Sequence, residues 1–178
     1  LLPIISDNQK KSIELLKEKL NNFSVLFSNN WYNMMYKKLG ILDPIEKDKN
    51  LVDSLLELMK DYKADYTNTF AALTLNDVSD DSLFTSNKFK KWRTKWESRI
   101  NSSDNNTKIF KLMHKQNPLV IPRNHLVELA LEKSINGNYN HFDDLLKLVS
   151  NPYNYKSNCS FQNTPKGFDD SYKTFCGT

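Results

Sequence analysis

Glycine and cysteine are both scarce in this sequence, with four glycines and two cysteines among 178 residues. So few glycines argue against a β-rich fold with many tight turns and against glycine-rich phosphate loops. The sequence also has no GxGxxG, GxxxxGK or HExxH motif. Two cysteines do not make a disulfide framework, so we expect a reducing, cytoplasmic compartment.

Long apolar runs are absent as well. No stretch approaches the roughly 18 consecutive apolar residues of a membrane helix, so no membrane partner is expected. Charge of one sign is not concentrated either, because 25 Lys and Arg are interspersed with 21 Asp and Glu for a net charge of +4. Nucleic-acid-binding surfaces usually gather their basic residues, and we therefore expect no nucleic-acid partner.

One segment, Phe89–Trp96, does combine basic and aromatic residues as single-strand-binding proteins do. On a helix, however, Phe89, Trp92 and Trp96 fall on one face and the cations fall mainly on the others. This arrangement favours a buried aromatic face with a solvated back, and nucleic-acid binding is the alternative interpretation.

Apolar residues recur at helical spacing along almost the whole chain, which predicts an all-α bundle of seven or eight short helices with an irregular C-terminal arm. The helical domain is expected over residues 1–152 and the arm over residues 153–178. A first helix, with Ile13, Leu16 and Leu20 facing inward, should end at the Asn21-Asn22 pair. A second should end at Gly40. Further helices are expected at 48–62, 65–73, 86 or 87 to 100, and 107–116, then one with Pro122 in its first turn and one capped by Asn140.

Residues able to carry chemistry are few and dispersed. The three histidines lie far apart and the two cysteines lack neighbouring histidines, so neither set has the spacing of a metal site. His125 and Glu128 would share a helix face, but a surface pair is the simpler interpretation. We predict no catalytic, cofactor-binding or metal-binding residue in this chain.

The most distinctive segment is Asn117–Leu126, which reads NPLVIPRNHL. It resembles the NPxxVxRNxL signature of the SelO (YdiU) family, with Pro122 where the family usually has leucine or a similar residue. Similar family segments are found at Trp31–Gly40, Asp65–Phe70, Gly137–Tyr153 and Phe175–Thr178. The resemblance preserves their order over nearly the whole chain and identifies it as the C-terminal region of such a protein.

The resemblance implies a parent protein with a kinase-like fold that binds ATP and Mg²⁺. Such proteins transfer AMP, not phosphate, to Ser, Thr or Tyr hydroxyls of protein substrates. Their catalytic and metal-binding residues lie in the part that precedes this chain, so the chain alone is expected to be inactive, with the N-terminal kinase-like core as its partner. The start at Leu1-Leu2-Pro3, without an initiator Met, agrees with a piece of a longer protein. The alternative is a free-standing helical module that binds a protein or nucleic acid.

Three residues are candidates for a role in that longer protein. Arg123 and Asn124 are expected in the first turn of a helix, where Arg123 can reach carbonyls or a carboxylate of a neighbouring element in bidentate fashion. We predict that both serve docking rather than catalysis. For Cys176, on the terminal arm, the resemblance implies a redox role through a disulfide with the core. Cys159 is the alternative partner within the chain.

Overall fold

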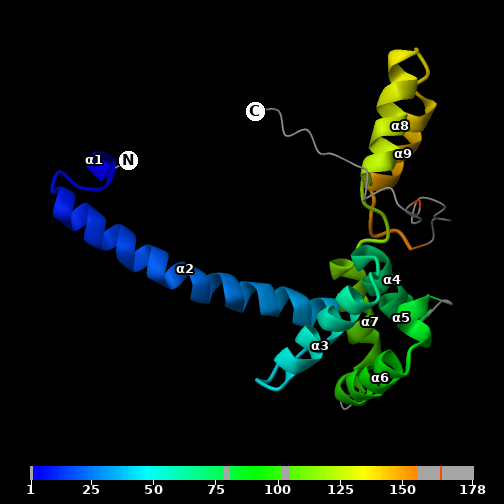
Figure 1. The fold of residues 1–178 in the computed structure, drawn as a ribbon, viewed down its shortest axis with the longest axis horizontal. Helices are drawn as coiled ribbons and strands as arrows, with labels where there is room; N and C mark the ends of the chain where they lie inside the picture. The colour runs from blue at the N-terminus through cyan, green and yellow to red at the C-terminus, as the bar shows by residue number, and fades with distance from the viewer. Residues whose placement is uncertain (1, 78–80, 102–104, 156–164, 166–178) are drawn as a thin grey trace.

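The fold is all-helical in a computed structural model that describes residues 2–77, 81–101, 105–155 and 165 (Figure 1). This confirms the predicted fold class, and no strand occurs within those residues. The helical segments are α1 (Leu2–Ile5), α2 (Gln9–Lys38), α3 (Asp48–Asp61), α4 (Tyr66–Leu75), α5 (Ser82–Thr85), α6 (Asn87–Ile100), α7 (Asn106–Gln116), α8 (Asn124–Ile135) and α9 (Asn140–Val149).

Helix α2 is a single helix of 30 residues, so the expected break at Asn21-Asn22 is wrong. Inside a helix an asparagine costs only a few tenths of a kcal/mol relative to alanine, which is too little to end one. An asparagine ends a helix when its backbone turns left-handed, as Asn76 does after α4 with a φ of 55°. The bundle therefore contains one long helix among short ones.

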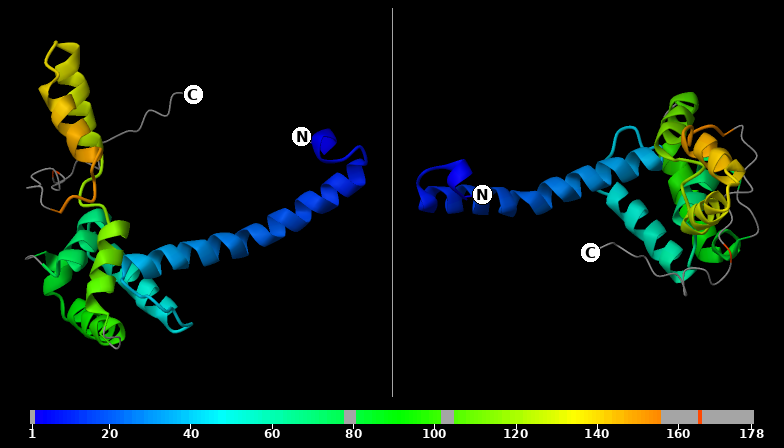
Figure 2. Two further views of the ribbon diagram at one scale, coloured as in Figure 1. Left: turned by 180° about the vertical axis from the view of Figure 1, so that it is seen from behind. Right: turned by 90° about the horizontal axis from the view of Figure 1, so that it is seen from above.

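The N-terminal part of α2 stands clear of the other helices, apart from the short α1 beside its start (Figure 2). The expected inward stripe is wrong as a consequence: Leu16 is half-buried, whereas Ile13 is 37% and Leu20 is 70% exposed. Periodicity correctly marks one face of the helix as apolar, but within the described part of the chain nothing covers that face along most of its length.

The end of α2 follows the sequence prediction. Gly40 has a φ of +72°, and the backbone N–H groups of Gly40 and Ile41 donate to the carbonyls of Lys37 (3.1 Å) and Tyr36 (2.9 Å). This pair of hydrogen bonds is the Schellman arrangement that glycine favours after a helix. A Cβ on Gly40 would also lie 2.6 Å from Ile109 on α7, so the position admits only glycine without rearrangement.

The main core is built where the last turns of α2 meet α3, α4, α6 and α7. Phe89, Trp92 and Trp96 on α6 are buried and stack in sequence, which confirms the predicted aromatic core face. The indole N–H of Trp92 donates to the Leu51 carbonyl at 2.9 Å. The four lysines of the same helix (Lys88, Lys90, Lys91 and Lys95) are exposed. The basic and aromatic residues of this segment therefore occupy different faces.

Helices α8 and α9 form a hairpin that projects from this body (Figure 1). Two expected boundaries are wrong by one or two residues. Arg123, not a residue before Pro122, takes the N-cap position of α8, and Tyr139, not Asn140, takes that of α9. The short α5 was not predicted; it begins where the Asp81 carboxylate accepts the N–H of Leu83 at 2.9 Å.

Candidate functional site

The distinctive segment at 117–126 lies where the hairpin joins the body, and Asn117 is its most connected residue. Its side chain is fully buried at the end of α7. The amide nitrogen donates to the Lys38 carbonyl at 2.9 Å and to the Thr74 hydroxyl at 2.8 Å. Its backbone carbonyl accepts a hydrogen bond from the Tyr155 hydroxyl at 2.7 Å. One asparagine thus joins the ends of α2, α4 and α7 to the chain that follows α9.

Lys38, at the end of α2, is a half-buried cation beside Asn117. Its ammonium group donates to the Gln116 carbonyl at 3.0 Å and to the Asn117 Oδ1 at 3.3 Å, and it lies over the rings of Phe70 and Tyr66. Burial lowers the pKa of Lys38. Carbonyls at a helix C-terminus attract positive charge, so this lysine stabilises the end of α7.

The two Asn-Pro steps of the chain lie side by side at this junction. The backbone N–H of Leu119, two residues after Asn117, donates to the Pro152 carbonyl at 2.7 Å. Leu119 and Val120 are buried with Ala71 in a small second apolar cluster that includes Tyr155. The first residues of the expected irregular arm therefore pack on the body.

Arg123 forms a second connection between hairpin and body. Its Nη1 donates to Asp65 Oδ2 at 2.6 Å, and its Nη2 donates to Asp65 Oδ1 and to Asn68 Oδ1, both at 3.0 Å. Asp65 is itself the N-cap of α4 and accepts the backbone N–H of Asn68 at 2.8 Å. The guanidinium is thus held in the bidentate geometry that arginine forms with carboxylates.

The electrostatics of Asp65 follow from these contacts. Burial alone raises the pKa of a carboxyl, but here it is outweighed. The hydrogen bond from Arg123, those from the backbone of Asn68 and Thr67, and the charge of Arg123 together hold the pKa of Asp65 below its ordinary value. The ionised pair is therefore the stable form at neutral pH.

We expect Arg123→Ala to lower the free energy of unfolding by about 2 kcal/mol at pH 7, because hydrogen bonds to charged groups contribute about 1.5–3 kcal/mol. Since folding lowers the pKa of Asp65, the stabilisation is complete above the unfolded pKa, near 4, and is lost as the pH falls through the folded value. Urea unfolding of both proteins between pH 7 and pH 3 should show the difference shrinking.

Asn124 supplies the matched control for that experiment. It is exposed at the first position of α8, and its side chain forms no hydrogen bond with the described residues. Asn124→Ala should change stability by less than about 0.5 kcal/mol. If Arg123→Ala cost no more than Asn124→Ala, or if its cost did not depend on pH, the Asp65 pair would have no structural role.

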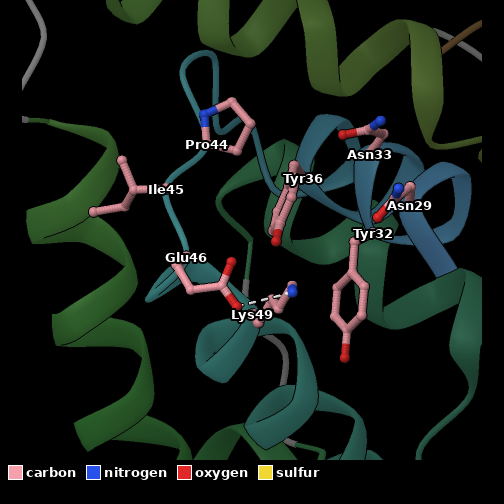
Figure 3. A pocket seen from close by; sticks show the side chains of 8 residues that line it. All are labelled: Asn29, Tyr32, Asn33, Tyr36, Pro44, Ile45, Glu46 and Lys49. Atoms are coloured by element: carbon pink, nitrogen blue, oxygen red, sulfur yellow. Dashed lines mark hydrogen bonds and ion pairs between the residues drawn. The ribbon is translucent and has the colours of Figure 1, made fainter. Parts of the chain in front are cut away.

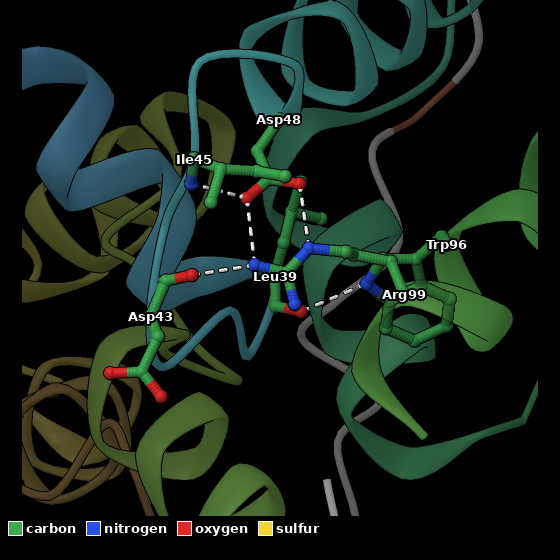
Figure 4. A network of polar contacts seen from close by, with 6 residues as sticks. All are labelled: Leu39, Asp43, Ile45, Asp48, Trp96 and Arg99. Atoms are coloured by element: carbon green, nitrogen blue, oxygen red, sulfur yellow. Dashed lines mark hydrogen bonds and ion pairs between the residues drawn. The ribbon is translucent and has the colours of Figure 1, made fainter. Parts of the chain in front are cut away.

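A second group of polar contacts lies beneath the loop after α2 (Figure 4). Asp48, 2% exposed, accepts hydrogen bonds from Arg99 at 2.8 and 2.9 Å and from the Ile45 backbone N–H at 2.8 Å. Arg99 also donates to the Asp43 carbonyl at 2.6 Å, and the Trp96 indole donates to the Leu39 carbonyl at 2.8 Å. The network fastens α6 to the loop and the start of α3.

An open groove of about 340 Å³ lies on the other side of this loop (Figure 3). It is lined by Asn29, Tyr32, Asn33, Tyr36, Pro44, Ile45, Glu46 and Lys49. Lys49 pairs with Glu46 at 2.9 Å, and the Tyr32 hydroxyl donates to the Asp53 carboxylate at 3.0 Å. That hydrogen bond, followed by burial, raises the pKa of Tyr32. The charged groups that line the groove, Lys49 and Glu46, are thus already paired with each other.

Cys159 and Cys176 lie outside the described residues, and the redox role of Cys176 stays a prediction. Among residues 2–77, 81–101, 105–155 and 165, no three His, Cys, Asp or Glu side chains gather as metal ligands would. Over the same residues, no helix is both long enough and apolar enough to cross a membrane.

Sequence reasoning placed Arg123 at a helix start but did not identify its partner. It missed the roles of Asn117, Asp48 and Lys38 altogether. A signal for Asn117 was present, because the residue opens the distinctive segment and precedes a proline. Nothing in the local pattern distinguishes Asp48 from the exposed acidic residues around it.

Comparison with known proteins shows the family of the chain. The family described as protein adenylyltransferase SelO matches residues 3–150. Proteins named protein nucleotidyltransferase YdiU are similar: 39% identical over 181 residues in Bacillus thuringiensis subsp. konkukian, 42% over 181 in Lachnoclostridium phytofermentans and 38% over 180 in a Clostridium perfringens strain. Each alignment covers 100% of this chain and 37% of the relative, so the chain spans little more than a third of the relatives' length. With its family match covering most of its residues, the chain belongs to the SelO family.

Proposed function

We propose that this chain is the C-terminal helical part of a longer protein adenylyltransferase. In that protein a kinase-like core, with ATP and Mg²⁺, transfers AMP to Ser, Thr or Tyr hydroxyls of other proteins. The supporting observation is the family match over residues 3–150 in a chain that spans 37% of its nucleotidyltransferase relatives. On this proposal the chain supports or regulates the core and supplies no catalytic residue.

The contacts of the distinctive segment fit a supporting role. Asn117 and Arg123 direct their polar atoms at other helices of the same chain, where they fix the position of the hairpin. The exposed surface of the chain also distinguishes this proposal from the alternative of a free-standing binding module. A module should be polar outside its binding groove, whereas a domain built to pack on a core should leave an exposed apolar patch. On α2, Leu20, Phe23 and Phe27 are each at least 60% exposed, which favours the packed domain.

The activity is tested by measuring the transfer of labelled AMP from ATP to protein. The longer protein that contains this chain should label itself or added protein in a Mg²⁺-dependent reaction, and EDTA should abolish the labelling. Residues 1–178 alone should label nothing under the same conditions. Transfer by residues 1–178 alone would contradict the supporting role, and no transfer by the longer protein would contradict the assigned activity.

A further inference from the structure

Six apolar residues of α2 share one face of the helix, and most of them are exposed. They follow a repeat of alternating three- and four-residue intervals that is interrupted only by Asn30, and we call this row the α2 seam: Ile13, Leu16, Leu20, Phe23, Phe27 and Met34. An average spacing of 3.5 residues is the repeat of helices that pack along one another in coiled coils. The seam covers 21 residue steps, or about 32 Å of helix at about 1.5 Å per residue.

The row is most open to solvent in its middle, at Leu20, Phe23 and Phe27, whereas Leu16 is half-buried. Phe23 is 63% and Phe27 is 60% exposed, and their rings stack on each other with centroids 6.1 Å apart. In both Figure 1 and Figure 2 this part of α2 runs away from the helical body. Most helices in proteins owe their stability to the packing of an apolar face, so a helix of this length with such a face indicates a missing partner surface.

The one polar member of the repeat is Asn30, between Phe27 and Met34. Its side chain is exposed and takes the position where a coiled coil would place another apolar residue. A single asparagine within such a repeat fixes the register of two helices, because it must find a polar partner opposite. The pattern therefore suits a specific pairing better than nonspecific burial.

Charges beside the seam indicate the chemistry of the partner. Between residues 10 and 33, the charged residues at the two flanking positions of the repeat are Lys10, Lys17 and Lys19, while Glu14 and Glu18 lie on the back of the helix. Lys19 has only a 3.9 Å contact with Glu18, and both side chains are largely exposed. Flanking charges select partners of opposite sign.

We propose that the α2 seam packs along a helical surface with an acidic rim in the remainder of the SelO polypeptide. The inference rests on the proposed function only in that the chain is part of a longer protein. The relatives supply the missing length, because the chain spans 37% of each, and the family match from residue 3 places α2 inside the family region. A second copy is a poorer partner, since it offers lysines and no carboxylate at the same flanking positions.

The test is zero-length cross-linking of lysines to carboxylates in the full-length protein, mapped by mass spectrometry. Light and heavy isotope-labelled protein are mixed, so that links within one polypeptide are distinguished from links between copies. Lys17 and Lys19 should link to Asp or Glu residues outside residues 1–178, within one polypeptide. Links only between copies, or no links beyond residues 1–178, would overturn the proposal.

Two matched variants show whether the seam itself is responsible. Phe27 and Val25 are 60% and 58% exposed, two residues apart and so on opposite sides of the helix. Phe27→Glu should lower the yield of those links about tenfold, as expected for a loss of about 1.4 kcal/mol, while Val25→Glu should leave it unchanged. Equal yields for the two variants would contradict docking through the seam.

The same wild-type protein is assayed for AMP transfer. Specific links without AMP transfer would contradict the proposed activity alone. AMP transfer without such links would contradict the docking alone.

Discussion

Replacing Trp96 with alanine should lower the free energy of unfolding by about 3–5 kcal/mol, the usual cost of truncating a large aromatic residue in a packed core. Trp96 is 3% exposed and stacks on Trp92 with ring centroids 5.7 Å apart and planes 9° from parallel. The change leaves a cavity and also removes the indole N–H that donates to the Leu39 carbonyl at 2.8 Å. Both losses destabilise the same junction, where α6 meets the end of α2.

Urea unfolding followed by circular dichroism measures this cost. Lys95→Ala is the control, because Lys95 is the exposed neighbour of Trp96 on α6 and its loss should change stability by less than about 0.5 kcal/mol. A Trp96→Ala protein that unfolds like the wild type, but loses affinity for single-stranded nucleic acid, would replace the core interpretation with the binding-module alternative.

Asp48→Ala should be about as costly, at roughly 3 kcal/mol, the lower end of the range for breaking a buried ion pair. The substitution removes the acceptor of three hydrogen bonds, two from Arg99 and one from the Ile45 backbone. The side chain of Arg99 is 26% exposed, so water can partly solvate it after the change, which is why the lower end applies.

A double-mutant cycle isolates the pair from other effects of truncation. Asp48→Ala, Arg99→Ala and the double variant are compared by urea unfolding, and the double variant should cost clearly less than the two single costs added together. Asp61→Ala is the exposed control, since its 3.5 Å pair with Lys88 is open to solvent and should contribute less than about 1 kcal/mol. Strict additivity for Asp48 and Arg99 would show that the buried pair is not coupled.

Local signals predicted the helices whose ends carry strong capping or turn residues. Ser86 caps α6 by accepting the Phe89 N–H at 3.1 Å, and Gly40 ends α2, both as expected from residue type. Local signals failed for the middle of α2, because the Asn21-Asn22 pair is compatible with both a break and a helix.

The hydrogen-bond partners of Arg123 and Asn117 could not be predicted from the sequence, for a different reason. The sequence indicated that Arg123 can bind a carboxylate, but 21 acidic residues were available, and the partner lies 58 positions away. Asn117 reaches Lys38 and Thr74 across 79 and 43 positions. Spacing rules describe one helix or one turn, so they contain no information on pairs that only packing brings together.

The hydrogen bond between Leu119 and Pro152 gives the α8–α9 hairpin a topology of its own. The chain leaves the body and returns to it at one point, so residues 120–151 form a closed excursion with a single stem. Arg123, bound to Asp65, acts as a brace just beyond that stem. Lengthening or shortening the tip near Gly137 changes no contact of the body. A mechanical load applied at the tip reaches the rest of the chain as a torque on the stem, on its brace and on the apolar cluster in which Leu148 and Val149 pack with Ala71.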